Sequence, residues 1–258
     1  MNAKGMLRGA GTDLLTAIQF LTRIPVSARY EPDALVHAAK FFPLVGLIVG
    51  ACAAGLNVLL TPHLPRLATA ILLVVFLVLI TGCLHEDGLA DAADALGGGW
   101  TREQILIILK DSRIGSYGAA ALTLSLVARV VLLASLQANQ VAWYLIVSQV
   151  LCRWSTLPLS AFLPSARSAI DGGTPGQGSR IARLISPGTL VFGSLFSFAV
   201  AAIALKMHAI VVIGGAMLLT LLSGVYYKRR TGGVTGDFFG ATNQLTEIFV
   251  YFAGVWIR

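Results

Sequence analysis

The chain has 258 residues, of which 56% are apolar and only 12% are charged, and its formal net charge is +7. Soluble domains have about 25% charged residues, so this composition excludes an ordinary soluble domain and predicts a protein surrounded by lipid. The basic residues are spread along the chain and form no single patch, so we expect no nucleic-acid partner.

Seven stretches are apolar enough to cross a bilayer as helices, a distance that takes about 20 residues. They lie near 41–60, 67–84, 117–136, 141–163, 189–205, 208–227 and 242–257, and the last contains Glu247. No strand-like alternation is present, which disfavours a barrel. The prediction is an all-α, polytopic integral membrane helical bundle of about seven transmembrane helices (six to eight), plus short interfacial helices, in one domain over 1–258.

The N-terminal segment, 1–40, does not resemble a cleavable signal. Leu14, Leu15, Ile18 and Leu21 recur at helical spacing. This spacing predicts a short helix that either lies in the membrane interface or packs on the bundle.

The distribution of Lys and Arg predicts the topology. Alternate loops hold Lys4, Arg8, Arg23, Arg29, Lys40, Arg102, Lys110, Arg113, Arg167, Arg180, Arg183, Lys228, Arg229 and Arg230. The opposite loops hold only Arg66, Lys206 and Arg258. Because basic loops stay on the cytoplasmic side, segments 1–40, 85–116, 164–188 and 228–241 are predicted to be cytoplasmic.

The two long polar loops differ in character. In 85–116, Thr101 and Gln104 have the spacing of a capping box, which predicts a short helix near 102–110. Segment 164–188 is rich in Gly, Ser and Pro and predicts a flexible loop, either a lid or a plain connector. The three cysteines are scattered in apolar segments, which indicates neither a disulfide framework nor a zinc site.

An acidic cluster follows the second apolar stretch. Asp87, Asp91 and Asp94 are spaced i, i+4 and i+7, so they share one helix face. Like charges on one face repel, and a divalent cation such as Mg²⁺ would compensate them. The alternative is a solvated acidic face. Glu86 and His85 lie off this face, and His85 could orient a ligand, move protons or simply occupy the interface.

Basic side chains near the cluster could hold phosphate. Lys110 and Arg113 are either ion-pair partners of the acids or ligands of non-bridging phosphate oxygens. Arg129 and Arg153 lie inside apolar stretches and should face inwards, pairing with acids or reaching phosphate.

The stretch "GGVTGDFFGATNQLTE" adds a second polar loop, 228–241. Its glycines permit close backbone approach. Asp237 starts a helix and could be a cap, a metal ligand or both. Asn243 and Glu247 follow at i, i+4 spacing, and Glu247 requires a partner inside the bundle.

Five stretches together resemble the cobalamin synthase (adenosylcobinamide-GDP ribazoletransferase) family: "FLTRIPV", "FFPLVGLIVG", "TGCLHEDGLADAADALGG", "LKDSRIGSYG" and "GGVTGDFFGATNQLTE". The resemblance runs from about residue 17 to 250. It implies a multi-pass protein of the prokaryotic cytoplasmic (inner) membrane, with an active site facing the cytoplasm and Mg²⁺ as cofactor. The implied substrates are adenosylcobinamide-GDP and α-ribazole or its 5′-phosphate, and GMP is the leaving group.

The resemblance also implies roles for particular residues. Metal ligands would be Asp87, Asp91 and Asp94, with Glu86 and Asp237 as further candidates. Lys110 and Arg113 would bind the diphosphate, and Asp111 or a cluster carboxylate such as Asp91 or Asp94 would accept the proton. From their own positions in the sequence, we add Arg129, Arg153 and Asn243 as substrate-binding candidates and His85 as a catalytic candidate. Gln244 stands where the family often has Glu and is left out.

Two rival functions remain at this point. A CDP-alcohol phosphotransferase would use a similar acidic helix, but Asp91 stands where its motif requires Arg. An ion-coupled transporter would use intramembrane charges such as Arg129 and Arg153, but the remaining charges concentrate at one membrane face. A homo-oligomer is compatible with the sequence.

Overall fold

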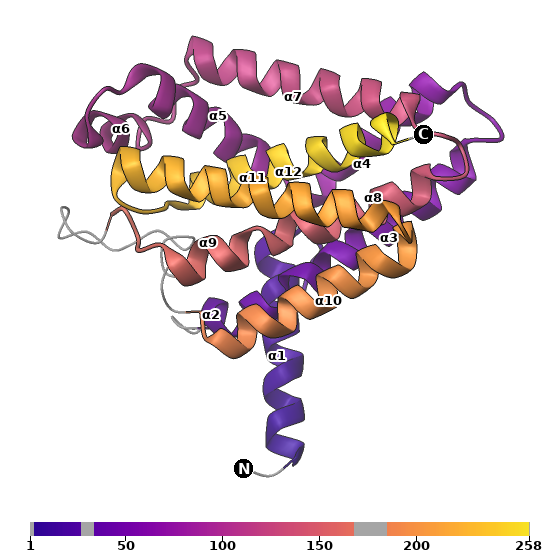
Figure 1. The fold of residues 1–258 in the computed structure, drawn as a ribbon, viewed down its shortest axis with the longest axis horizontal. Coiled ribbons are helices and arrows are strands. Elements are labelled where there is room, and N and C mark those ends of the chain that lie inside the picture. The colour runs from indigo at the N-terminus through magenta and orange to yellow at the C-terminus, as the bar shows by residue number, and fades with distance from the viewer. Residues whose placement is uncertain (1–2, 27–33, 168–184, 258) are drawn as a thin grey trace.

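A computed structural model describes residues 3–26, 34–167 and 185–257. The elements are α1 (Ala3–Leu21), α2 (Ala34–Ala38), a 3₁₀ turn η1 (Ala39–Phe41), α3 (Phe42–Leu60), α4 (Arg66–Thr81), α5 (Leu84–Gly98), α6 (Arg102–Ile108), α7 (Ser116–Ser135), α8 (Val141–Trp154), α9 (Thr156–Phe162), α10 (Pro187–Leu205), α11 (His208–Thr231) and α12 (Gly236–Trp256). The all-α bundle is confirmed, and the longest helices lie side by side (Figure 1). Much of segment 164–188 lies outside the described residues.

Five helical runs in the described chain are long and apolar enough to span a membrane: Ala34–Leu60, Ser116–Ser135, Val141–Phe162, Pro187–Leu205 and His208–Thr231. A sixth is formed if α4 and α5 are counted together across an 89° bend. The central run, α8 with α9, has 78% of its apolar window buried, against 22% for α7 and for α10. The outer helices therefore present apolar side chains outwards, as lipid contact requires.

The predicted seventh span, 242–257, is not among these candidates. Helix α12 covers this stretch but carries buried polar side chains, including Thr242, Asn243, Gln244 and Glu247. In Figure 1 it lies inside the bundle, behind α11. Thr242, Gln244 and Glu247 contact polar side chains of neighbouring helices. Helix α12 therefore has the composition of an inner helix, with a lower hydropathy than a lipid-facing one.

A sharp bend separates the apolar helix α4 from the acidic helix α5. Gly82 and Cys83 both adopt left-handed backbone conformations, with φ of 63° and 60°. Their amides donate to the carbonyls of Leu79 and Val78, the paired bonds of a Schellman motif. The Arg23 amide donates to Ile80 O at 2.7 Å, so the "FLTRIPV" stretch braces the bend. Helix α4 is the apolar member of the bent pair of helices. Helix α5, which carries four carboxylates, belongs to the polar end of the bundle.

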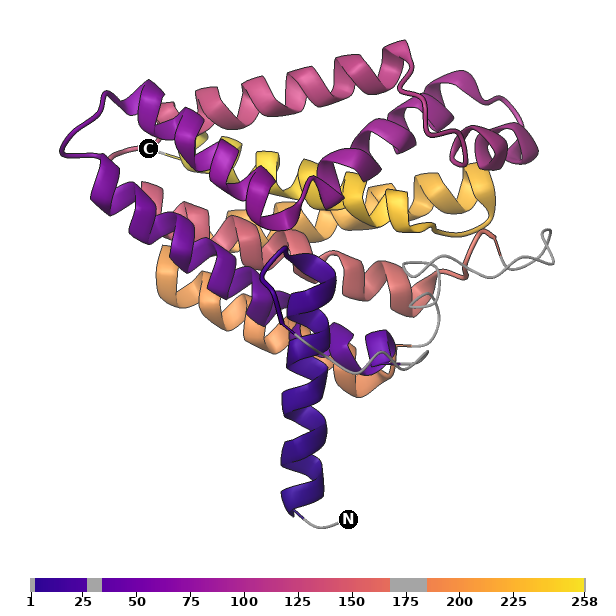
Figure 2. The same ribbon diagram turned by 180° about the vertical axis from the view of Figure 1, so that it is seen from behind.

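Three polar segments meet at one end of the bundle. The Arg102 guanidinium donates to Thr231 O and Ala166 O, and Arg230 donates to Gly99 O. The capping box of Thr101 and Gln104 starts α6, as predicted, and the helix ends at Ile108. These contacts confirm that the 85–116 and 228–241 loops lie at the same end as residues 164–167 (Figure 2).

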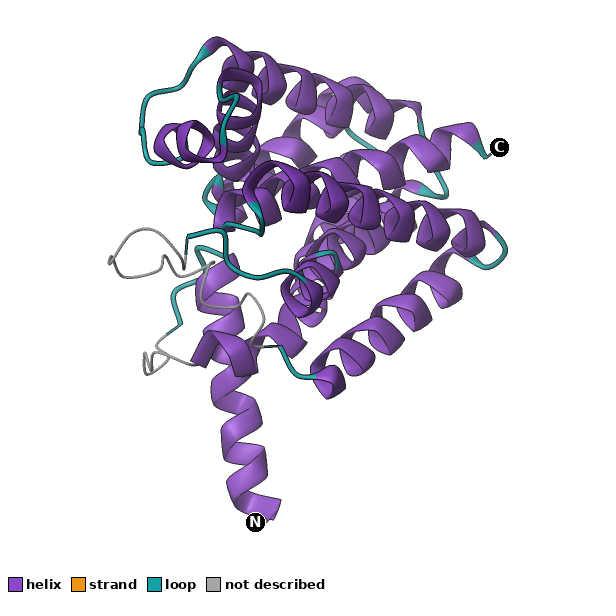
Figure 3. Ribbon diagram, turned by 60° about the vertical axis from the view of Figure 1, so that its left-hand side comes forward, coloured by secondary structure: helices purple, strands orange, loops and turns teal. Residues whose placement is uncertain are grey.

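The N-terminal helix α1 runs across the direction of the long helices and projects from the bundle (Figures 1 and 3). Its C-terminal part is anchored, because Lys40 and Asp13 form an ion pair at 2.8 Å. Contact of α1 with the membrane interface stays a prediction.

Candidate active site

Helices α5 and α12 cross in direct backbone contact. A Cβ on Gly88 would lie 3.1 Å from the Gly240 Cα, and a Cβ on Gly240 would meet the backbone of His85. Any larger residue would push the two helices apart. The glycines therefore bring the acidic face of α5 against the first turn of α12.

This crossing gathers three carboxylates, those of Asp87, Asp91 and Asp237, which we call the acidic group. Burial and the neighbouring charges of Asp87, Asp237 and Asp94 raise the pKa of Asp91 to about 6. Burial also raises the pKa of Asp237, against the effect of Arg167. The carboxylates repel one another, so a cation at this place would be stabilised.

Arg167 supplies one such cation, and the sequence reasoning missed it. Its Nη2 lies 3.3 Å from Asp237 Oδ2 and also donates to Leu109 O. The side chain is placed by backbone pairing, since Val234 donates to Pro164 O and Ala166 donates to Val234 O. Gly233 permits this pairing because a Cβ there would collide with Pro164 O. The available signal in the sequence was only that Arg167 belongs to a basic loop.

Asp94 holds the start of α7, a contact that the sequence did not predict. Its two oxygens accept hydrogen bonds from the amides of Gly115 and Gly118 at 2.7 and 2.8 Å. These amides open α7, whose N-cap residue makes no side-chain cap of its own. Asp94 thus caps α7, and its predicted role as a metal ligand stays a prediction.

The segment from Leu109 to Gly115 contacts neighbours of the acidic group at both of its ends. Leu109 O accepts a hydrogen bond from Arg167, and the Gly115 amide donates one to Asp94. Lys110 and Arg113 are therefore near the site, and both are exposed. Arg113 forms a bidentate ion pair with Asp111, at 2.6 Å for the shorter contact. This pairing lowers the pKa of Asp111 to about 2, so Asp111 is a poor candidate for the general base.

Glu86 and Arg129 turn away from the acidic group into a buried network. Arg129 Nη1 lies 2.7 Å from Glu86 Oε1, and its Nε lies 3.1 Å from Glu247 Oε1. The Gln244 amide oxygen accepts from Arg129, and Tyr251 donates to Glu247. All five side chains are buried. The predictions that Glu86 binds metal and that Arg129 binds diphosphate are not supported by this arrangement, because each is buried and paired with the other.

The remaining predicted residues are also internal. Arg153 is 1% exposed and donates to the carbonyl and side-chain oxygens of Gln149. His85 is buried on α5, and its backbone lies at the crossing with Gly240 of α12. Asn243 is 2% exposed on α12. Arg153, His85 and Asn243 are therefore all buried, and their predicted roles stay predictions.

Within the described residues, no three His, Cys, Asp or Glu side chains converge as a ready-made metal cage. Mg²⁺ at phosphate-handling sites usually takes one or two carboxylates and completes its shell with waters and substrate phosphates. The acidic group fits that requirement, since carboxylate oxygens suit a hard cation and need no third protein ligand.

Fold and site together define a polytopic helical membrane protein whose acidic site lies at the basic end of the bundle. The chain matches the family described as cobalamin-5-phosphate synthase over residues 13–255 and belongs to that family. It is thus an enzyme of cobalamin biosynthesis, which removes the two rival functions.

Relatives match over nearly the whole chain. The adenosylcobinamide-GDP ribazoletransferase of Polaromonas sp. (strain JS666) is 40% identical over 93% of this chain and 94% of its own length. That of Azorhizobium caulinodans is 40% identical over 95% of both chains. That of Pseudoalteromonas atlantica is 35% identical over 92% of this chain and 88% of its own. No solved structure matches the chain.

Proposed function

We propose that this protein is an adenosylcobinamide-GDP ribazoletransferase that acts with Mg²⁺. A hydroxyl of α-ribazole, or of its 5′-phosphate, attacks the phosphorus attached to cobinamide. The bond to GMP breaks, GMP leaves with the bond electrons, and a phosphodiester is formed. One observation carries the proposal: a chain of this family brings carboxylates from α5 and α12 together beside a basic rim.

One or two carboxylates of the acidic group, drawn from Asp87, Asp91 and Asp237, would hold Mg²⁺ together with the diphosphate of the substrate. The bound ion would neutralise charge on the diphosphate and on the departing GMP. Support comes from the pKa of Asp91, which burial and then repulsion by Asp87, Asp237 and Asp94 raise, because a carboxylate in such surroundings gains from a nearby cation. Asp94 supports the site indirectly by holding the start of α7 against α5.

Arg167, Lys110 and Arg113 would bind the diphosphate oxygens. Arg167 already lies against Asp237. Its Nε is buried and has no partner among the described residues. A guanidinium at this place can exchange the carboxylate for a phosphate oxygen when the carboxylate takes up metal. The two exposed cations of segment 109–115 would then contact the outer phosphate.

The proton of the attacking hydroxyl would pass to a carboxylate of the acidic group. Asp111 is the poorer candidate, since a base works best when its pKa lies near the working pH, and the ion pair with Arg113 lowers the pKa of Asp111 to about 2.

The basic end of the bundle would face the cytoplasm of a prokaryotic cell, in its inner membrane. Support comes from the excess of Lys and Arg in the loops that meet there. Both phosphorylated substrates would then reach the site from the side on which nucleotides are found.

The test is a reconstituted reaction. Protein purified in detergent is mixed with adenosylcobinamide-GDP, α-ribazole and MgCl₂, and cobalamin and GMP are quantified. Asp91→Asn should remove activity while the melting temperature is retained. Glu103→Gln, an exposed acid on α6 outside the site, is the matched control and should stay active. Absence of product with every divalent cation tried would refute the proposal.

A further inference from the structure

A long apolar groove opens on the outside of the bundle, away from the acidic group. Its volume is about 390 Å³, and α8, α9, α10 and α11 supply its walls. Helices α10 and α11 meet at their connecting turn and diverge towards the basic end (Figures 1 and 3). Side chains of both helices line the groove.

Regular stripes of side chains line the groove on two helices. On α10 they are Leu190, Ser194 and Phe198, spaced by four residues. On α11 the stripe runs from Met217 to Lys228, which spans about 16 Å at a rise of about 1.5 Å per residue. The length of the groove is therefore comparable with the thickness of the hydrocarbon region of one bilayer leaflet.

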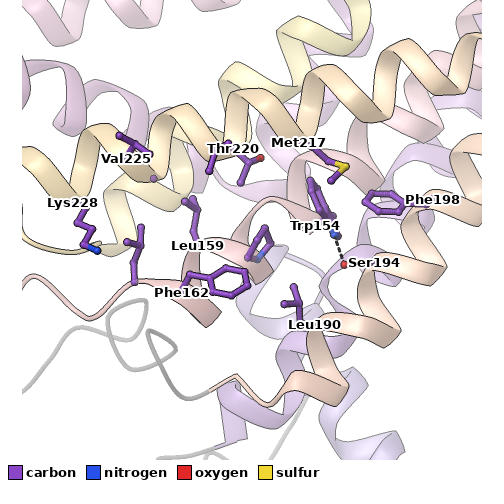
Figure 4. A pocket seen from close by; sticks show the side chains of 14 residues that line it. Trp154, Leu159, Phe162, Leu190, Ser194, Phe198, Met217, Thr220, Val225 and Lys228 are labelled. Atoms are coloured by element: carbon purple, nitrogen blue, oxygen red, sulfur yellow. Dashed lines mark hydrogen bonds between the residues drawn. The ribbon is translucent and has the colours of Figure 1, made fainter.

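The interior of the groove offers almost nothing to a polar ligand. Trp154 Nε1 donates to Ser194 Oγ at 2.9 Å, and the Thr220 hydroxyl donates to Ala216 O. These polar groups are already satisfied inside the protein, as the dashed line in Figure 4 shows for Trp154. Phe162 and Leu221 are 71% and 62% exposed, so their apolar surfaces are accessible to an apolar ligand. A hydrocarbon chain matches this lining.

One end of the groove carries positive charge. Lys228 lines that end, and Arg229 follows it in the last turn of α11 (Figure 4). Both are exposed, and Lys228 makes no ion pair with any acid in the described residues. By contrast, Arg230 is held by the carbonyls of Leu96 and Gly99.

We propose that the groove binds one anionic phospholipid, with an acyl chain between α10 and α11 and the phosphate at Lys228 and Arg229. The apolar groove between spanning helices accepts an acyl chain from the bilayer. The cations at its end favour an anionic headgroup by charge complementarity. The lipid would fill the gap where α10 and α11 diverge and so hold α11 beside α12.

Native mass spectrometry in detergent tests this inference without any reference to catalysis. Dipalmitoylphosphatidylglycerol should bind as a single tight equivalent, and dipalmitoylphosphatidylcholine should bind more weakly. Lys228→Gln should weaken phosphatidylglycerol binding about five-fold, the ratio for about 1 kcal/mol per basic residue near an anionic surface. Lys206→Gln, an exposed lysine at the other end of α11, should leave binding unchanged.

A second pair of variants tests the groove itself. Leu221→Trp should obstruct it and reduce lipid binding, whereas Leu222→Trp, equally exposed but outside the lining, should not. Equal binding of both lipids, equal effects of the two lysine variants, or equal effects of the two tryptophan variants would overturn the proposal. Displacement of the lipid by α-ribazole would also overturn it and would make the groove a substrate subsite.

Discussion

Replacing Arg129 by methionine should strongly destabilise the protein. The side chain is 1% exposed and contacts Glu86 and Glu247 at 2.7 and 3.1 Å. Methionine fills most of the same volume but removes the only charge that compensates two buried carboxylates in this contact. Removing one partner of a buried ion pair costs about 3–5 kcal/mol. This is a large share of the roughly 5–15 kcal/mol by which a native protein is stable.

Thermal unfolding in detergent measures the effect. A loss of about 3–5 kcal/mol corresponds to a fall in Tm of roughly 6–20 °C for a chain of this size. Arg113→Met is the matched control. The Arg113 side chain is 88% exposed and its ion pair with Asp111 lies on the surface, so the control should change stability by less than about 1 kcal/mol.

A combined variant separates charge from packing. Arg129→Met together with Glu86→Gln and Glu247→Gln removes all three charges, and it should recover more than half of the lost Tm. If Arg129→Met melts like Arg113→Met, the buried network does not exist as described. If the combined variant melts no higher than the single one, the loss comes from packing and the electrostatic reasoning is wrong.

Three further predictions concern the site. Because folding raises the pKa of Asp91 from 3.8 to about 6, the native state binds the extra proton, so metal-free protein should lose stability as pH rises through this interval. Mg²⁺ should oppose that loss, and a Tm profile unaffected by Mg²⁺ would contradict a metal at Asp91. Arg167→Gln should lower kcat/KM for adenosylcobinamide-GDP roughly 10- to 100-fold, since a charged hydrogen bond contributes about 1.5–3 kcal/mol. Arg167→Lys should restore part of the lost kcat/KM. If KM and kcat are both unchanged in Arg167→Gln, this side chain does not contact the diphosphate. Asp94→Ala should lower the free energy of unfolding by about 1–2 kcal/mol through loss of the α7 cap, and the Tm of Asp94→Asn should be intermediate. If Asp94→Ala instead loses activity at an unchanged Tm, the result would support a role as metal ligand.

Features that depend on local sequence were predictable. The capping box at Thr101 and Gln104 is complete within four residues, so the start of α6 follows from it directly. Hydropathy identified the outer helices because their side chains face one uniform solvent. It failed for α12, where polar residues such as Asn243 and Glu247 face other helices, so a window average no longer measures exposure to lipid.

The partners of individual charges were not predictable from spacing. Glu86 and Asp87 are neighbours in sequence, yet Glu86 pairs with Arg129 from α7 and Asp87 is exposed at the surface. Which neighbour turns inwards depends on how α5 packs between α7 and α12, and that packing is set by contacts far away in the chain. Arg167 shows the same limit, because its place beside Asp237 depends on backbone pairing between 164–166 and 233–235.

The bend that precedes helix α5 determines where the carboxylates of this helix lie. Had the chain continued straight from α4, its four carboxylates would have extended an apolar span and stayed unpaired in hydrocarbon. The left-handed pair Gly82 and Cys83 redirects the helix by 89°, so one side packs on α12 through Gly88. Glu86 is then paired with Arg129 inside the bundle, while Asp87 is exposed and Asp91 half-buried at the surface. A protein that separates its acids in this way keeps its structural ion pairs buried and the carboxylates proposed to bind a cation accessible, so stability and cation binding can be altered independently by mutation.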